Sequence, residues 1–213
     1  MELNKKQVQE IENYLQDNGL TYWDIRVEIL DHLITLIESK MQNGATYKTA
    51  LESSMLELNL NGNLEGLNKS RLLKINKIVR GQYFRKVKDY LTKPFFLIII
   101  LLSILSYFLI FKNASFFMFK AVTVVLLFAP LIYGVLLYFT AFAKKQKSGY
   151  LVYSSFYIFF SFLMLNIFLQ FFQPEGIFPV TKETQRLIWF LVTCVNSVFS
   201  YAAITNYINT KRK

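Results

Sequence analysis

The sequence predicts an all-α fold with three parts: a small N-terminal three-helix cytoplasmic module, a basic amphipathic linker helix and a four-helix transmembrane bundle. Apolar residues make up 54% of the 213 residues and aromatic residues 17%, more than an ordinary soluble fold contains. Four apolar runs, each long enough to cross a bilayer, occupy the later part of the chain. Residues 69–93, directly before the first run, contain nine basic residues and one acid, Asp89. We therefore expect boundaries that separate residues 1–62, 63–93 and 94–213.

The net charge of +10 is unevenly divided along the chain. The first 68 residues contain five basic and eleven acidic residues, whereas the remainder contains nineteen basic and three acidic residues. A basic balance often indicates nucleic-acid binding, but here the basic residues lie next to apolar segments. Attraction to anionic headgroups and orientation of the spans explain that placement more simply. We expect membrane lipids as partners, and the pattern argues against nucleic acid.

The spans are expected at residues 95–111, 121–143, 150–172 and 187–208. Each must be helical, because lipid offers no hydrogen-bond partner to the backbone. Basic residues are dense before the first span, in the second loop and at the C-terminus, and sparse in the first and third loops. By the positive-inside rule, both termini are cytoplasmic.

No Asp, Glu, His, Lys or Arg lies inside the four spans. This absence argues against a proton relay, an ion-coupled pump and an intramembrane metalloenzyme, so we predict no enzyme, no catalytic residue, no metal and no cofactor. Two polar stripes at helical spacing are expected to face protein and to hydrogen-bond between helices, with a permeation path as the alternative. They are Asn166, Gln170 and Gln173 on the third span, and Thr193, Asn196 and Ser200 on the fourth.

Residues 1–60 predict three short amphipathic helices. Asn4 with Gln7, Thr21 with Asp24, and Thr46 suit N-terminal capping of the three. The second helix is apolar over more than half its circumference and is expected to be packed on two sides. Its apolar residues are Trp23, Val27, Leu30, Ile34, Ile37 and Met41, widened by Ile25, Ile29, Leu33 and Leu36.

Arg26 projects into this apolar sector. We expect an ion pair with Glu10 or Glu12 of the first helix, although a guanidinium that extends to solvent would fit the same pattern.

The exposed side of the second helix is predicted to be an acidic ridge. One histidine beside carboxylates on a single face lacks the converging ligands of a metal centre, so solvated acids are the simpler interpretation. Because a unit of about sixty residues has a small core, we expect it to lean on the following helix, on a protein partner in the cytoplasm or membrane, or on a second copy of the chain. The predicted partner-binding residues are Asp24, Glu28, Asp31, His32 and Glu38.

The linker helix, residues 68–91, has an apolar side formed by Leu72, Val79, Tyr83, Val87 and Tyr90. This side is expected either to cover the module or to lie among lipid headgroups, or else the helix only connects and orients the first span. The residues expected to contact headgroups and set the topology are Arg71, Lys74, Lys77, Arg85 and Lys88, together with Lys144, Lys145 and Lys147 of the second loop.

The motif Glu28-x-x-Asp31-His32-Leu33, followed by Gly44 and by Ala50-Leu51, resembles the HAAS-type signalling domain and the related permease prefix domains of bacterial membrane proteins. The resemblance covers about residues 5–60, and Asn59 stands where the family commonly ends in glycine. It implies a bacterial inner-membrane protein, often regulatory and often paired genetically with a PadR-like transcription factor, or else a permease accessory domain. It implies no catalytic residue.

We therefore predict a non-enzymatic integral membrane protein that acts by contact between its cytoplasmic module and a partner. The alternative is a component or accessory subunit of a membrane transporter, and an intramembrane enzyme is a distant third.

Overall fold

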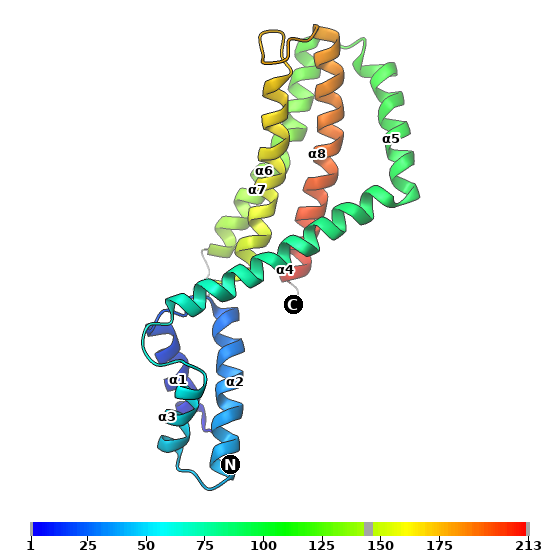
Figure 1. Ribbon diagram of the computed structural model, residues 1–213. Helices are drawn as coiled ribbons and strands as arrows, with labels where there is room; N and C mark the ends of the chain where they lie inside the picture. The colour runs from blue at the N-terminus through cyan, green and yellow to red at the C-terminus, as the bar shows by residue number, and fades with distance from the viewer. Residues whose placement is uncertain (1, 143–146, 212–213) are drawn as a thin grey trace. The chain divides into compact units, whose positions relative to one another are not determined.

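The computed structural model describes residues 2–142 and 147–211, apart from some side chains within the helices. The predicted all-α class is confirmed: the described residues form eight α-helices and one π-helical turn, and contain no strand (Figure 1). The chain divides into two units, which are described separately below. The first contains Met1–Lys77 and Lys144–Tyr150, and the second contains Ile78–Ala143 and Leu151–Lys213.

The first unit contains α1 (Lys5–Asp17), α2 (Trp23–Gln42), α3 (Tyr47–Glu57) and the start of α4 (Glu65–Thr92). The predicted capping of α1 is confirmed, since Asn4 and Gln7 exchange two bonds of 2.9 Å between side chain and backbone. The predicted cap of α3 is also confirmed, with Thr46 Oγ1 accepting from the Thr49 amide at 3.3 Å.

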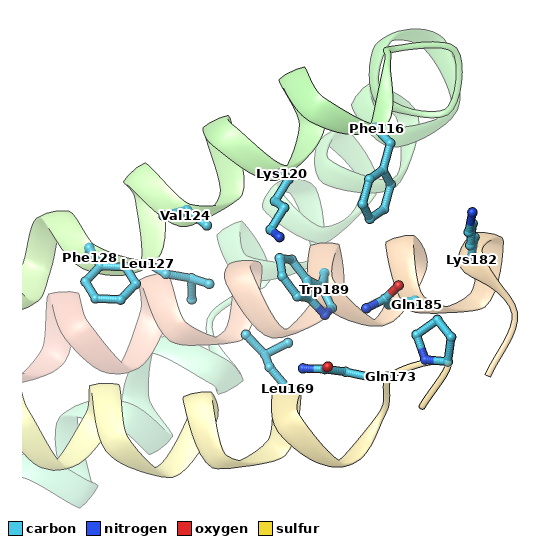
Figure 2. Close-up of a pocket in the computed structure, with 11 residues that line it drawn as sticks. Phe116, Lys120, Val124, Leu127, Phe128, Leu169, Gln173, Lys182, Gln185 and Trp189 are labelled. Atoms are coloured by element: carbon cyan, nitrogen blue, oxygen red, sulfur yellow. The ribbon is translucent and has the colours of Figure 1, made fainter. Parts of the chain in front are cut away.

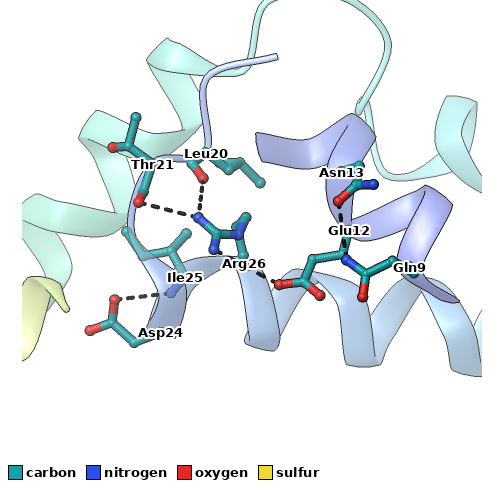
Figure 3. Close-up of polar contacts among 8 residues, drawn as sticks. All are labelled: Gln9, Glu12, Asn13, Leu20, Thr21, Asp24, Ile25 and Arg26. Carbon is teal, nitrogen blue, oxygen red and sulfur yellow. Dashed lines mark hydrogen bonds and ion pairs between the residues drawn. The ribbon is translucent and has the colours of Figure 1, made fainter. Parts of the chain in front are cut away.

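The predicted Thr21–Asp24 cap of α2 is wrong. The helix begins after Tyr22 with no side-chain cap. Thr21 Oγ1 instead accepts a bond of 3.3 Å from the Asn68 side chain. Asp24 accepts from the Ile25 amide at 3.1 Å (Figure 3) and from a segment far along the chain, described below. Both side chains are thus engaged by groups that the local sequence does not contain.

The exit from α3 uses Asn59 in the left-handed conformation, with φ of 52°. The Asn59 amide donates to Leu56 O at 3.1 Å, and the Leu60 amide donates to Met55 O at 2.8 Å. These two bonds form a Schellman motif, which satisfies carbonyls that the helix end would leave free. Asparagine tolerates this conformation better than other residues with a side chain, so it can occupy a position usually given to glycine.

One side of α2 forms the core of the first unit, and the other side is open. Ile25, Ile29, Leu33 and Ile37 are each at most 5% exposed and are accompanied by the buried Ile11, Leu15, Leu20, Ala50, Leu60 and Leu64. As expected of a helix packed on two sides, α2 contacts both α1 and α3, but its apolar sector is not fully covered, because Trp23 is 41% exposed and Val27 is 40% exposed. Only the side that faces α1 and α3 is buried.

Arg26 is 5% exposed and lies within this core. Its Nη1 donates to the carbonyls of Leu20 and Thr21 at 3.0 and 3.2 Å (Figure 3). Its Nη2 lies 3.8 Å from Glu12 Oε1, which confirms the predicted ion pair with the first helix. A buried charge of this kind is tolerated only when it is paired and hydrogen-bonded.

The second unit contains the rest of α4 and the helices α5 (Pro94–Ser106), α6 (Phe116–Phe142) and α8 (Lys182–Lys211), with a π-helical turn at Tyr107–Phe111. It also contains α7 (Gly149–Phe171) except for the first two residues of that helix, which belong to the first unit. Among the described residues, α6 and α8 are long and apolar enough to cross a membrane. A third span results if α4 and α5, bent by 68°, count as one. The described apolar part of α7, Gly149–Leu163, is shorter. The fold is therefore that of a helical membrane protein.

The apolar side of α4 within the second unit is covered by protein. Val79 and Tyr83 are fully buried and Val87 is 5% exposed. The Tyr83 ring stacks on Tyr157 of α7 with centroids 5.0 Å apart, and the Asn206 amide of α8 donates to Val79 O at 3.5 Å. This stretch of α4 therefore packs on α7 and α8. The sequence pattern indicated that its apolar side covers the module or lies among lipid headgroups, and did not indicate packing on the later helices.

Arg186 connects the start of α8 to the segment before α6 by hydrogen bonds and aromatic contacts. Its Nη1 donates to Lys112 O at 2.8 Å and to Ala114 O at 3.1 Å. Its guanidinium also lies 5.8 and 5.4 Å from the ring centroids of Phe116 and Phe119. Arginine suits this position because its planar group can donate at its edge while it stacks on aromatic faces.

Candidate functional site

The beginning of α2 is joined to the beginning of α7 within the first unit. Asp24 Oδ1 accepts a bond of 3.0 Å from the Gly149 amide. Asp24 Oδ2 accepts from the Tyr150 amide at 3.0 Å and from Ser148 Oγ at 3.1 Å. The Trp23 amide donates to Lys147 O at 2.8 Å, beside a parallel bridge between Tyr22 and Lys147. We call residues 22–24 and 147–150 the α2–α7 junction.

The junction has the chemistry of a helix N-terminus closed by a carboxylate. The first amides of a helix have no partner inside the helix and carry the positive end of its dipole. A carboxylate that accepts from two of them forms charge-assisted bonds, which are stronger than bonds between neutral groups. Such a contact contributes about 0.3–2 kcal/mol, and the higher values apply where solvent is partly excluded, as at the half-buried Asp24.

Gly149 lies in close contact with α4 at the junction. A Cβ atom at this position would lie 2.9 Å from Leu72 Cδ2 and 3.2 Å from Ile75 Cδ1. The first of these distances is shorter than side chains accept, so the neighbours would have to move. The start of α7 is thus held on one side by Asp24 of α2 and on the other by α4.

The structure does not gather the five predicted partner-binding residues into one open acidic ridge. Asp24 belongs to the junction, Glu28 forms an ion pair of 2.9 Å with Arg71, and Glu38 accepts from the Leu3 amide at 2.9 Å. Asp31 and His32 are exposed. Glu28 is nevertheless exposed, as are Asp31 and His32, so the binding of a partner by these residues stays a prediction.

The open side of α2 also carries apolar residues, so it is a mixed apolar and polar surface. Trp23, Val27 and Asp31 follow each other at i, i+4 and i+8, so they lie on one side of the helix, with His32 adjacent. We call these four residues the exposed α2 face. Sequence periodicity did not show that Trp23 and Val27 would be exposed. The apolar sector of α2 covers more than half of the helix, and its width does not reveal which side the neighbouring helices leave uncovered.

The basic residues expected to contact headgroups have different environments. Arg71 is paired with Glu28, whereas Lys74, Lys77, Arg85 and Lys88 are exposed. Lys147 is exposed, and its backbone belongs to the junction. Lys144 and Lys145 lie outside the described residues.

Lys86 of α4 is an additional basic residue that sequence reasoning did not single out. Its Nζ is buried and has no hydrogen-bond partner among the described residues. Burial lowers the pKa of the Lys86 ammonium below its ordinary value, because desolvation penalises the charged form.

The polar stripe of α8 faces protein. Asn196 is fully buried, Ser200 is 2% exposed and Thr193 is 5% exposed. Their hydrogen bonding differs from the expected bonds between helices, since Thr193 Oγ1 donates to Trp189 O of its own helix at 2.7 Å. The Asn196 amide and the Ser200 hydroxyl have no partner in the described part of the chain.

The α7 stripe is described only in part. The side chains of Asn166 and Gln170 lie outside the described residues, and Gln173 lines a cavity between α6, α7 and α8. Across the described residues, no three metal-ligating side chains converge.

No family model matches the chain, and no curated protein or solved structure is similar to it. The features of the described residues that indicate a function are the junction, the exposed α2 face and the buried polar groups of the second unit.

Proposed function

We propose that this chain is a four-span bacterial inner-membrane protein whose acidic N-terminal module binds a protein partner in the cytoplasm and passes that contact to the membrane part. In this proposal α5 with its π-helical turn, α6, α7 and α8 are the spans, and both termini are cytoplasmic. The apolarity of α6 and α8 and the distribution of basic residues support this arrangement. The module is of the HAAS type, and the proposal gives the chain no catalytic role and no cofactor.

The observation that carries the proposal is the double engagement of α2. One side of this helix presents the exposed α2 face, and its first turn supplies Asp24 to the start of α7. Trp23 belongs to both, since its side chain is open and its backbone donates to Lys147 O. A partner that displaces the first turn of α2 would therefore disturb the N-terminal amides of α7.

The chemistry of the exposed α2 face indicates a partner that is both basic and apolar. Trp23 and Val27 supply apolar area, and tryptophan is enriched where interfaces gain most of their affinity. Asp31 beside them favours a cationic partner and would be repelled by anionic headgroups. A basic amphipathic segment of another protein fits this surface better than a lipid surface does.

Photo-crosslinking from the exposed α2 face tests the proposal. A photoreactive residue at Val27 is expected to capture one protein in intact cells, and Asp31→Lys is expected to abolish that capture. The matched control is a photoreactive residue at Leu56, which is apolar and 65% exposed on α3. A product at twice the mass of the chain would indicate a second copy as the partner. Capture that is equal from Val27 and Leu56, or indifferent to Asp31→Lys, would contradict a specific contact.

A transporter component is the second candidate, and the fully buried Asn196 favours it. The Asn196 amide has no partner among the described residues, and a buried amide in a membrane helix is costly unless a polar group satisfies it. In a transporter, the polar partner of the Asn196 amide would be a passing substrate or a water molecule. Flux into vesicles that is lost in Asn196→Leu but kept in Asn206→Leu, whose amide already bonds to Val79 O, would favour transport over the contact mechanism.

A further inference from the structure

A cavity of about 470 Å³ lies among α6, α7 and α8, beside the first turns of α8 (Figure 2). Its volume falls in the range of about 300–1,000 Å³ that is typical of small-molecule sites. Its lining is divided into a polar and an apolar part. Lys120, Lys182, Gln173, Gln185 and Trp189 form the polar part, and the apolar part is formed mainly by Val124, Leu127, Phe128 and Leu169.

The charge of the lining favours an anion. Among the described residues, the lining includes Lys120 and Lys182 and no Asp or Glu. Lys182 lies at the rim, with its side chain turned away from the cavity in Figure 2. Lys182 is also the first residue of α8, so the positive end of that helix lies at the same place. In Figure 2 the Lys120 side chain extends from α6 toward the Trp189 ring of α8.

Two buried donors on α8 supply an independent reason for a ligand here. Gln185 is 8% exposed and lines the cavity. Trp189, four residues later on the same side of the helix, has a buried Nε1 with no hydrogen-bond partner among the described residues. A buried indole N–H can only donate, and buried donors in folded proteins are almost always satisfied. An oxygen-bearing group inside the cavity would satisfy it.

The apolar part of the cavity continues along α6 from its polar part. Val124, Leu127 and Phe128 follow Lys120 on α6, one of the two helices apolar enough to cross a membrane, and Leu169 lies opposite on α7. A free inorganic anion would leave this apolar area unused. A molecule with an anionic head and a hydrocarbon tail would fill both parts.

We propose that this cavity binds an anionic phospholipid, with the phosphate beside Lys120 and the first turns of α8, its oxygens accepting from Trp189 Nε1 and Gln185, Lys182 adding positive charge at the rim, and an acyl chain along α6. The choice of a phospholipid over a free phosphate rests on the placement of α6 and α8 in a membrane. The site does not involve the exposed α2 face, so its test is independent of the partner proposal.

The sequence provides a direct probe, because it contains two tryptophans, Trp23 and Trp189. Trp23→Phe leaves Trp189 as the sole tryptophan in the full chain, and it can be excited at wavelengths where tyrosine does not absorb. This variant is reconstituted into phosphatidylcholine vesicles that contain a small fraction of brominated phosphatidylglycerol or, in parallel, brominated phosphatidylcholine. Bromine quenches tryptophan at short range, so a lipid that binds in the cavity quenches more than its bulk fraction predicts. We expect an apparent preference of about fivefold or more for the anionic lipid.

The variants decide whether the preference belongs to this cavity. Lys120→Gln with Lys182→Gln is expected to remove it, and both side chains are exposed, so the fold is retained. Gln185→Glu, nearly the same size, is expected to remove it by placing a carboxylate inside. Lys112→Gln is the matched control, because Lys112 lies near the same end of α8 but does not line the cavity. This variant should keep the preference.

Three results would overturn the proposal. They are equal quenching by the two brominated lipids, a preference that survives both the double lysine variant and Gln185→Glu, and a preference that disappears when inorganic phosphate is added at millimolar concentration. The last result would assign the cavity to a free anion.

Discussion

Asp24 and Gly149 are joined by a hydrogen bond of 3.0 Å although 125 residues separate them in the sequence. Through this bond the first turn of α2 supplies an acceptor to the N-terminal amides of α7. The contact connects the acidic module to the segment that precedes a predicted span. The stability of the start of α7 therefore depends on a side chain of the module.

Replacement of Asp24 should loosen the start of α7. Asp24→Ala removes the three bonds to residues 148–150 and the bond from the Ile25 amide, and should lower the free energy of unfolding by about 1–2 kcal/mol, whereas Asp24→Asn, which keeps an acceptor but loses the charge, should cost about half as much. Hydrogen exchange at the Gly149 and Tyr150 amides should accelerate in both variants. Asp31→Asn, an exposed acid on the same helix, is the control. Unchanged exchange in Asp24→Ala would contradict the capping role.

A methyl group at Gly149 should also disturb the junction. Gly149→Ala would bring Cβ to 2.9 Å from Leu72 Cδ2, and because this atom is the end of a flexible side chain, the cost should be about 1 kcal/mol, the low end for overpacking. Gly81→Ala is the matched control, because Gly81 is helical and its Cβ would meet no atom within 4 Å. That change should leave stability unchanged or raise it by up to about 1 kcal/mol, since alanine favours helix. Thermal unfolding in detergent measures both, and equal melting temperatures would be the contrary result.

Local features of the first unit could be predicted from the sequence, and distant contacts could not. The Asn4–Gln7 and Thr46 caps depend on residues three apart, and Arg26 reaches Glu12 because both lie in the first two helices. The role of Asp24 depends on a segment near residue 148, and no local pattern points there. Its predicted cap with Thr21 failed for this reason.

The candidate surfaces show the same limit. Trp23 and Val27 continue an apolar period, but the period does not tell which part of a wide sector α1 and α3 cover. On α8, the burial of Asn196 followed from its spacing with Ser200, whereas the lack of a partner for its amide required coordinates.

Arg186 should hold the segment between α5 and α6 through its planar geometry. Arg186→Lys keeps the charge but cannot stack on Phe119 while donating in a fixed plane to Lys112 O and Ala114 O. We expect residues 112–115 to become more sensitive to a protease added on the side of the membrane that they face. The free energy of unfolding should fall by about 1–2 kcal/mol. Arg85→Lys, an exposed arginine on α4, should change neither property. Equal resistance to protease in the two variants would argue against the role of Arg186 in holding this segment.

Lys86 should make stability depend on alkaline pH. Because burial lowers its pKa in the folded state below the ordinary 10.5, the unfolded state binds its proton more tightly. The resulting cost to stability is fully present below the folded pKa and disappears as the pH rises to about 10.5. Lys86→Met should therefore raise the free energy of unfolding by about 1 kcal/mol at pH 7, with a difference that shrinks toward pH 10.5. Lys88→Met, at an exposed position, should give no such pH-dependent difference, and a constant gain for Lys86→Met at all pH values would refute the assignment.

Disulfide trapping of the α2–α7 junction in native membranes tests the central claim most directly. Tyr22 and Lys147 are partners in a parallel bridge, so cysteines at these positions lie close enough to be joined. The experiment uses Tyr22→Cys with Lys147→Cys in a Cys194→Ser background, which removes the single native cysteine. The comparison pair is Tyr22→Cys with Lys112→Cys, which the proposed topology places on opposite sides of the membrane. Rapid oxidation of the first pair within one chain, and none of the second, is the predicted result. No intrachain product from the first pair, or equal products from both, would contradict the account.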